Sequence, residues 1–161
     1  MDIKAKKQTL RLIPYGLYVL TAHGGDGALE FGGATVSWLS QASFEPPRIV
    51  VGLRRDSTIW QTVQAAGSFV VNLLGSGQKD LASRFFRHVQ ADEKTLGGCP
   101  YHTGLVGAPI LDDVPAYLEC RVAQTIDAGD HTLFLADIVE AGVQHEMPAL
   151  TMAETTWHYG G

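Results

Sequence analysis

The chain lacks several features that would place it in a common functional class. Its 161 residues include two cysteines, Cys99 and Cys120, without C-x-x-C spacing, so neither a disulfide framework nor a zinc site is indicated. No apolar run approaches the roughly 20 residues that span a bilayer, and the first residues lack the apolar stretch of a signal peptide. We therefore expect a cytoplasmic protein with no membrane partner.

Charge and nucleotide motifs are also sparse. Charged residues make up 18% of the chain and the net charge is −5, so the basic face that a nucleic-acid binder needs is missing. G-x-G-x-x-G, P-loop and G-x-S-x-G motifs are absent, so a nucleotide cofactor would have to bind by another route. The six histidines show no pair at metal-ligand spacing, and no metal is expected.

What the sequence does contain is glycine and short apolar runs. Hydrophobic residues make up 45% and glycine contributes 18 residues, which favours one strand-rich domain over residues 1–161. The runs predict strands over 16–22, 31–39, 48–53, 68–74, 117–126 and 132–139, with turns at 23–27 and 44–47.

Few segments have helical character. Residues 57–66 read as a helix capped by Ser57 and ended by Gly67, and 78–89 as an amphipathic helix. Residues 1–13 suit a short helix or arm, and 90–114 read as a long irregular loop that covers or contacts something. Helices this few argue against repeated βαβ units and favour a mostly β, closed or nearly closed antiparallel barrel.

Three segments could carry chemistry. In the first, Arg54-Arg55-Asp56-Ser57-Thr58 leads from a strand into a helix, where free N–H groups, hydroxyls and a cation suit a phosphate. The plainer alternative, which spacing alone favours, is that Ser57 only caps the helix and the arginines are solvated.

The second segment is Thr35-Val36-Ser37-Trp38, followed by Ser43. Small polar residues after Gly32 and Gly33 would let a planar ligand lie against the backbone, with hydroxyl and N–H groups at its polar edge. The alternative is a barrel strand with exposed hydroxyls.

The third segment is Gly129-Asp130-His131-Thr132, a turn that enters a strand. A histidine on such a rim suits a ligand, and Asp130 could orient its ring, although neighbouring strand residues point to opposite faces. A turn aspartate beside a surface histidine explains the same residues.

In order and spacing, these segments resemble the flavin reductase-like family of FMN-binding split barrels. The likeness covers roughly residues 11–145. It is carried by Pro14–Thr21 (PYGLYVLT), Ala34–Trp38 (ATVSW), Ser43–Pro47 (SFEPP), Arg55–Thr58 (RDST), Gly67–Leu74 (GSFVVNLL), Leu81–Phe85 (LASRF), Leu118–Arg121 (LECR) and Gly129–Thr132 (GDHT).

The resemblance implies a Greek-key split barrel that forms a homodimer and binds FMN, with FAD less expected. It places the segment from Thr35 to Trp38, with Ser43, along the flavin ring and Arg54, Ser57 and Thr58 near the phosphate. Phe85 and Arg87 would complete the pocket, and His131 would lie where the nicotinamide enters, as the catalytic residue.

The implied activity is an NAD(P)H-dependent flavin reductase, with NADH or NADPH as donor and a monooxygenase or other redox protein as possible partner. The alternative is a flavoredoxin-like electron carrier that keeps its FMN and has little NAD(P)H turnover. Trp38 departs from the family pattern, and the aromatic stretch 157–161 could reach over the pocket; both features bear on whether flavin exchanges.

Overall fold

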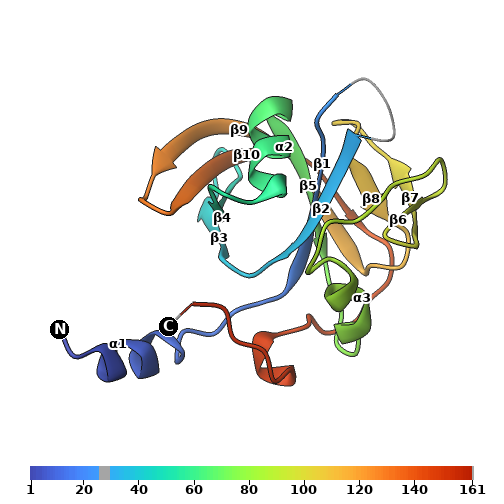
Figure 1. Cartoon of the computed structure of the whole chain (residues 1–161). Coiled ribbons are helices and arrows are strands. Elements are labelled where there is room, and N and C mark those ends of the chain that lie inside the picture. Colours follow the sequence, from blue (N-terminus) through green and yellow to red (C-terminus); the bar gives the residue numbers. More distant parts are fainter. Residues whose placement is uncertain (26–29, 161) are drawn as a thin grey trace.

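The computed structural model describes residues 1–25 and 30–160. Its largest unit is a seven-stranded antiparallel sheet in the order β2-β1-β5-β9-β10-β4-β3 (Figure 1). The strands are β1 (Tyr18–His23), β2 (Phe31–Val36), β3 (Leu39–Ser43), β4 (Arg48–Arg54), β5 (Ser68–Leu73), β9 (Ala116–Asp127) and β10 (His131–Val143).

The sheet curls into a split barrel that is not closed, because the described residues of its two edge strands are not hydrogen-bonded to each other as strands. Its two edge strands, β2 and β3, are consecutive in sequence and are joined by Ser37 and Trp38. The backbone carbonyl of Trp38 accepts a hydrogen bond from the N–H of Gly52 at 2.9 Å, which holds the bend against β4. The predicted mostly β split barrel is confirmed, and the single predicted strand over 31–39 is two strands separated by this bend.

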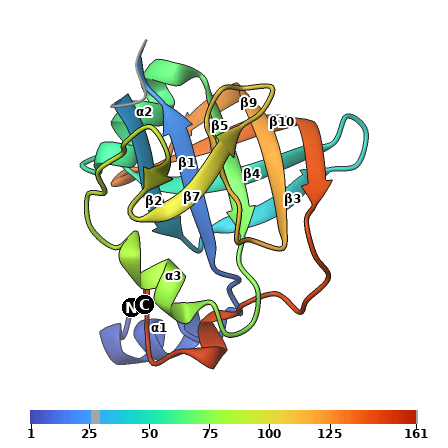
Figure 2. The same ribbon diagram turned by 90° about the vertical axis from the view of Figure 1, so that its right-hand side faces the viewer.

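Residues 90–114, which the sequence predicted as an irregular loop, form a second sheet of three strands. It contains β6 (Thr95–Leu96), β7 (Cys99–Thr103) and β8 (Pro109–Leu111). Gly97 and Gly98 both have positive φ, +60° and +74°, as a tight hairpin turn requires. The expectation of an irregular loop is wrong, but its role as a cover is right, because Ile110 and Leu111 are buried against the barrel. Figure 2 shows β7 lying over the strands of the large sheet.

The helices are short. Helix α1 (Ile3–Leu10) buries no residue and lies away from the barrel, as Figure 1 shows. Helix α2 (Thr58–Ala66) is capped by Ser57 and ends at Gly67, as predicted. A 3-10 turn, η2 (Met152–Glu154), precedes the last residues.

Helix α3 (Lys79–Arg84) ends five residues before the predicted end at residue 89. The carbonyl of Phe85 accepts a hydrogen bond from the N–H of Thr35 at 3.1 Å, and that of Ala82 accepts one from the Thr35 hydroxyl at 2.6 Å. These contacts with β2 turn the chain, so Phe85 and Val89 enter the core from outside the helix.

Two apolar cores lie on opposite faces of the same strands. The barrel core includes Leu20 and Phe69, and the second core, under the small sheet, includes Val19 and Leu74. Strict alternation along β9 from the buried Cys120 would place Ile126 on the inner face, but its side chain is 47% exposed. A register shift opposite Leu135 and Ala136 leaves Ala123 unmatched in β9, which reverses the alternation beyond it.

Three expectations from the sequence concern the turn at 23–27, membrane-spanning segments and metal ligands. The predicted turn at 23–27 is described only in part, because residues 26 and 27 lie outside the described residues. Among the residues described, no helix is long and apolar enough to cross a membrane, and no three His, Cys, Asp or Glu side chains gather as metal ligands would.

Candidate active site

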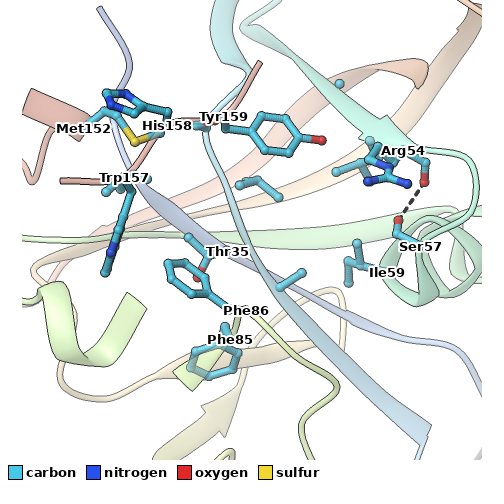
Figure 3. A pocket seen from close by; sticks show the side chains of 16 residues that line it. Thr35, Arg54, Ser57, Ile59, Phe85, Phe86, Met152, Trp157, His158 and Tyr159 are labelled. Atoms are coloured by element: carbon cyan, nitrogen blue, oxygen red, sulfur yellow. Dashed lines mark hydrogen bonds between the residues drawn. The ribbon is translucent and has the colours of Figure 1, made fainter. Parts of the chain in front are cut away.

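A cavity of about 490 Å³ opens where β2, β4, the end of α3 and the final segment of the chain meet (Figure 3). Its size lies within the range of pockets that hold one small cofactor. Its lining is mostly apolar, and the polar side chains among the lining residues are four hydroxyls, one imidazole and one guanidinium. The lining residues are Leu17, Ala34, Thr35, Val36, Ser37, Gly52, Leu53, Arg54, Ser57, Ile59, Phe85, Phe86, Met152, Trp157, His158 and Tyr159.

Strand β2 and helix α3 are locked together beside this cavity. Thr35 donates both its N–H and its hydroxyl hydrogen to carbonyls of the α3 segment, so it offers the cavity its methyl group and the hydroxyl lone pairs. A Cβ on Gly33 would lie 3.0 Å from the ring of Phe85, and the ring would have to move by a few tenths of an ångström, so glycine permits this close approach of strand and ring.

The polar rim of the cavity is formed by Arg54 and the start of α2. Ser57 accepts a hydrogen bond from the N–H of Trp60 at 3.3 Å and donates one to the carbonyl of Arg54 at 2.7 Å, so its hydroxyl is used as a helix cap. The guanidinium of Arg54 holds the carboxylate of Asp56 through Nε at 3.0 Å and through Nη2, which keeps the pKa of Asp56 below its usual range.

A second cavity of about 520 Å³ lies on the other side of Arg54 and Tyr159, which line both cavities. Unlike the first, it is lined largely by charged and polar residues. They are Trp38, Arg54, Arg55, Asp56, Gly129, Asp130, His131, Tyr159 and Gly160.

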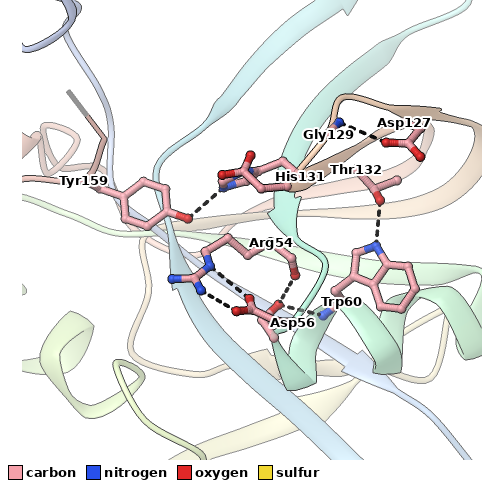
Figure 4. A network of polar contacts seen from close by, with 10 residues as sticks. Arg54, Asp56, Trp60, Asp127, Gly129, His131, Thr132 and Tyr159 are labelled. Carbon is pink, nitrogen blue, oxygen red and sulfur yellow. Dashed lines mark hydrogen bonds and ion pairs between the residues drawn. The ribbon is translucent and has the colours of Figure 1, made fainter. Parts of the chain in front are cut away.

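His131 is the central group of the second cavity, and it is 6% exposed (Figure 4). Its Nδ1 lies 2.8 Å from a carboxylate oxygen of Asp130, and its Nε2 lies 2.9 Å from the hydroxyl of Tyr159. Asp130 can reach the ring because it precedes the first residue of β10, in the turn. The hydrogen bond from His131 lowers the pKa of Asp130, so this carboxylate is charged at neutral pH and orients the imidazole.

The indole of Trp38 packs against the same histidine. The two ring centroids lie 4.5 Å apart and the planes are inclined by 30°. The ring of Tyr159 meets the edge of the indole at 5.3 Å, so the three rings form one aromatic group between the cavities.

Residues 157–160, called the terminal segment here, cover both cavities. Trp157 packs on Phe86 at 4.6 Å between ring centroids, and the ammonium group of Lys79 lies 5.4 Å from the Trp157 ring. The N–H of Met152 donates to the carbonyl of Tyr15 at 2.8 Å, and this hydrogen bond anchors the chain shortly before the terminal segment. The sequence indicated that the aromatic stretch 157–161 could reach over the pocket, and residues of the terminal segment do line both cavities. Gly161 lies outside the described residues.

Comparison with known proteins identifies this arrangement. The flavin reductase like domain matches residues 10–160. The chain belongs to the flavin reductase family. This membership confirms the resemblance and the prediction of a flavin-binding oxidoreductase with this fold.

Individual relatives agree with the assignment. The chain is 35% identical over 147 residues to a flavin reductase (NADH) of Kitasatospora aureofaciens, covering 87% of this chain and 72% of that protein. It is 34% identical over 129 residues to diflavin flavoprotein A 1 of Synechocystis, of which it spans 22%.

Solved structures show the same fold. The flavin reductase PheA2 superposes with a TM-score of 0.81 at 25% identity, covering 98% of this chain and 97% of that one. The styrene monooxygenase flavin reductase of Pseudomonas putida superposes with a TM-score of 0.72 at 29% identity, covering 84% of each chain.

The flavin reductase fold brings most of the predicted site residues to the two cavities. The first is lined by Thr35, Val36, Ser37, Arg54, Ser57 and Phe85, and the second by Trp38, His131 and again Arg54. Ser43 at the end of β3, exposed Thr58 and exposed Arg87 lie outside both linings. Phe86 and Met152 line the first cavity but were not predicted as site residues from the sequence. The only signal for the terminal segment was its cluster of aromatic residues.

Proposed function

We propose that this chain is an NADH-dependent flavin reductase that binds FMN in the first cavity and the nicotinamide in the second. One observation carries the proposal: an apolar cavity with a cationic rim adjoins a polar cavity with a buried, oriented histidine. The two share Arg54 and Tyr159 as a common wall. When bound, the flavin supplies the two-electron acceptor for a hydride from NADH.

The lining of the first cavity fits a flavin. Phe85, Phe86 and Trp157 provide apolar surface for the ring system and exclude water from it. Arg54 and the unpaired N–H groups at the start of α2 provide the charge and donors that one phosphate needs. This single anion-binding rim supports FMN rather than FAD.

One pairing in the second cavity supports NADH over NADPH. Arg55, which lines this cavity and not the first, donates to Asp127 at 2.8 Å. The 2′-phosphate of NADPH would therefore meet a guanidinium group that a carboxylate already neutralises, while Arg54 is assigned to the phosphate of FMN. The named NADH-dependent relative is consistent with this choice.

The residues of the chain position the reactants rather than transfer protons. Asp130 fixes the ring of His131 through Nδ1, so Nε2, which bonds Tyr159 in this structure, can exchange that partner for a polar edge of the nicotinamide. Hydride transfer depends chiefly on alignment, so no acid–base residue is indispensable in this proposal.

A flavoredoxin-like electron carrier is the second candidate. The observation that favours it is the terminal segment, because a covered flavin would be retained and would meet NADH poorly. Such a protein would pass electrons to a redox partner and show little NADH turnover.

The proposal includes a homodimer, a cytoplasmic location and delivery of reduced flavin to a monooxygenase. Exposed apolar side chains on α1 and on the β9–β10 hairpin, Ile3 and Ile126 among them, are suited to burial by a second copy. Both cysteines are free, as a reducing compartment keeps them. The monooxygenase component rests on the relationship to a styrene monooxygenase flavin reductase.

An absorbance spectrum of the purified, dialysed protein tests the function, followed by anaerobic NADH and then NADPH. A yellow protein bleached rapidly by NADH supports a reductase with bound FMN, and a colourless protein that reduces added FMN supports flavin as substrate. A yellow protein that neither nucleotide bleaches favours the electron carrier. Failure to bind or reduce flavin overturns the assignment.

A further inference from the structure

The indole N–H of Trp38 is a buried donor without an acceptor. Its nitrogen is inaccessible to solvent, and no hydrogen-bond partner lies within reach among the described residues. The indole N–H of Trp60, in contrast, donates to the hydroxyl of Thr132 at 2.8 Å. An unpaired buried donor is unfavourable, because its hydrogen bond to water is lost and not replaced.

The terminal segment lies over this donor. A Cβ placed on Gly160 would lie 2.9 Å from Cζ2 of Trp38 and 3.8 Å from its nitrogen, so the backbone of Gly160 covers that edge of the indole. Tyr159 meets the same ring edge-on and occupies Nε2 of His131 with its hydroxyl (Figure 4). The terminal segment therefore covers both the indole N–H of Trp38 and Nε2 of His131, but it provides a hydrogen-bond partner only to His131.

A ligand that displaced this segment would meet two groups side by side. The Trp38 N–H donates, and His131 Nε2 donates or accepts according to its tautomer. A primary carboxamide, with one carbonyl oxygen and one amino group, matches that pair. The nicotinamide ring that carries such a carboxamide would lie beside the aromatic surface that Tyr159 now covers.

We propose that Trp38 is a specificity-determining residue whose indole N–H binds the carboxamide of the nicotinamide, and that Tyr159 and Gly160 occupy this subsite in competition with the nucleotide. The inference rests on the proposed function, because it takes NADH as the donor. The terminal segment is thus an intramolecular competitor. The apparent affinity for nucleotide is reduced by the fraction of molecules in which the segment is in place.

Nuclear magnetic resonance tests the binding half directly. NAD⁺ is added to the full-length protein loaded with oxidised FMN, so no redox reaction occurs. We expect the indole N–H resonance of Trp38, assigned from its loss in Trp38→Phe, to move downfield as it gains an acceptor. The Trp60 resonance, already hydrogen-bonded, serves as the internal control. Saturating NAD⁺ without movement of the Trp38 resonance overturns the inference.

Two variants test the competition. Tyr159→Phe removes only the hydroxyl bonded to His131, and Gly160→Ala places a methyl group against Trp38 at a residue with φ of +78°. Both should tighten NAD⁺ binding and lower the KM for NADH by about two- to tenfold, the factor that one net hydrogen bond represents.

Tyr101→Phe is the matched control. It removes a tyrosine hydroxyl whose hydrogen bond to the carbonyl of Asp92 has a similar length, 3.0 Å, away from both cavities. It should leave NAD⁺ binding and the KM unchanged. Trp38→Phe should weaken NAD⁺ binding and raise the KM while the flavin stays bound.

The outcomes separate the inference from the proposed function. Parental NADH turnover with unchanged affinity in Tyr159→Phe and Gly160→Ala leaves the reductase standing and overturns the competition. A protein that reduces no flavin refutes the reductase, whereas the NAD⁺ titration still decides the subsite. If NAD⁺ binds to neither the parent nor the two variants, the inference fails as well.

Discussion

At the residue scale, His131 owes its orientation to two partners of different kinds. Asp130 bonds Nδ1 from an exposed turn, and Tyr159 bonds Nε2 from the terminal segment. Because the carboxylate bonds Nδ1 alone, it can keep fixing the ring while Nε2 changes partners. The histidine is therefore suited to hold a nucleotide in place.

We expect His131→Ala to lower kcat/KM for NADH on the order of ten- to a hundredfold, because alignment of donor and flavin is lost. The dissociation constant for FMN should change by less than about twofold, because His131 does not line the flavin cavity. Stopped-flow reduction under anaerobic conditions measures the first effect, and flavin fluorescence measures the second.

His131→Asn is the comparison for this variant. Asparagine keeps a short polar side chain that can donate or accept a hydrogen bond, so it should recover part of the lost rate. Release of FMN from both variants would instead show that His131 supports the flavin cavity, and the nicotinamide assignment would be wrong.

The phosphate site gives a second prediction at this scale. Arg54→Ala should weaken FMN binding by roughly ten- to a hundredfold, the range of a hydrogen bond to a charged group. Arg55→Ala removes the same charge one residue away, at a side chain that does not line the flavin cavity, and should bind FMN normally. Isothermal titration of both apoproteins measures the difference.

Ser57 needs a substitution that spares its cap. Ser57→Ala would lose the hydrogen bond from Trp60, and helix stability would fall together with any effect on phosphate. Ser57→Asp keeps a good cap but places a negative charge beside the phosphate, so FMN affinity should fall while Tm is retained. Unaltered FMN affinity in both Ser57→Asp and Arg54→Ala would contradict the phosphate assignment.

At the element scale, α2 could be predicted from the sequence because both of its ends are set by residues within the segment itself. The signals that start and end it are local: a serine cap and a glycine with φ of +65°. A Cβ on Gly67 would meet nothing within 4 Å, so only the backbone conformation demands glycine there.

Gly67→Ala should therefore lower the free energy of unfolding by about 1 kcal/mol, the penalty of a left-handed conformation for an ordinary residue. Gly67→Asn should lose less, because asparagine adopts this region more readily. Urea denaturation measures both variants. Equal stability of Gly67→Ala and the parent would show that the chain can change conformation at this position.

Other elements depended on contacts that the sequence does not display. The spacing of Leu81, Phe85 and Val89 suits a helix, but α3 ends at Arg84 because β2 takes up carbonyls at its end. The Gly97-Gly98 turn was a local signal for the small sheet, but the further glycines and the two prolines that follow it, Pro100 and Pro109, favoured a loop.

The same distinction explains the site. Residues 35–38 and 129–132 carry recognisable local patterns, so their role could be anticipated from the sequence. The contact between His131 and Tyr159 joins residues 28 positions apart, and no periodicity or motif announces it. The aromatic residues near the end of the chain indicated only that this stretch could reach over the pocket.

At the scale of the whole molecule, the two cores are coupled through shared strands. Val19 of β1 and Leu74, the residue after β5, belong to the core under the small sheet, while Leu20 of β1 and Phe69 of β5 belong to the barrel core. Neither core can lose its packing without disturbing β1 and β5. We therefore expect one cooperative unfolding transition for the described chain.

The two buried cysteines can report on this coupling, because Cys99 lies in the core under the small sheet and Cys120 in the barrel core. Burial raises the pKa of Cys120 to about 12 and also raises that of Cys99. At pH 8 the thiolate fraction of Cys120 is on the order of 10⁻⁴, so the folded protein should react slowly with thiol reagents.

Cys99→Ala and Cys120→Ala each leave a single reporter thiol. In both variants we expect the urea midpoint for thiol exposure to coincide with the midpoint from tryptophan fluorescence in the same variant. This internal reference removes the effect of the substitution on stability. Earlier exposure of Cys99 alone would show that the small sheet opens before the barrel, and the flavin cavity, which Phe85 lines from that core, would then loosen before the fold is lost.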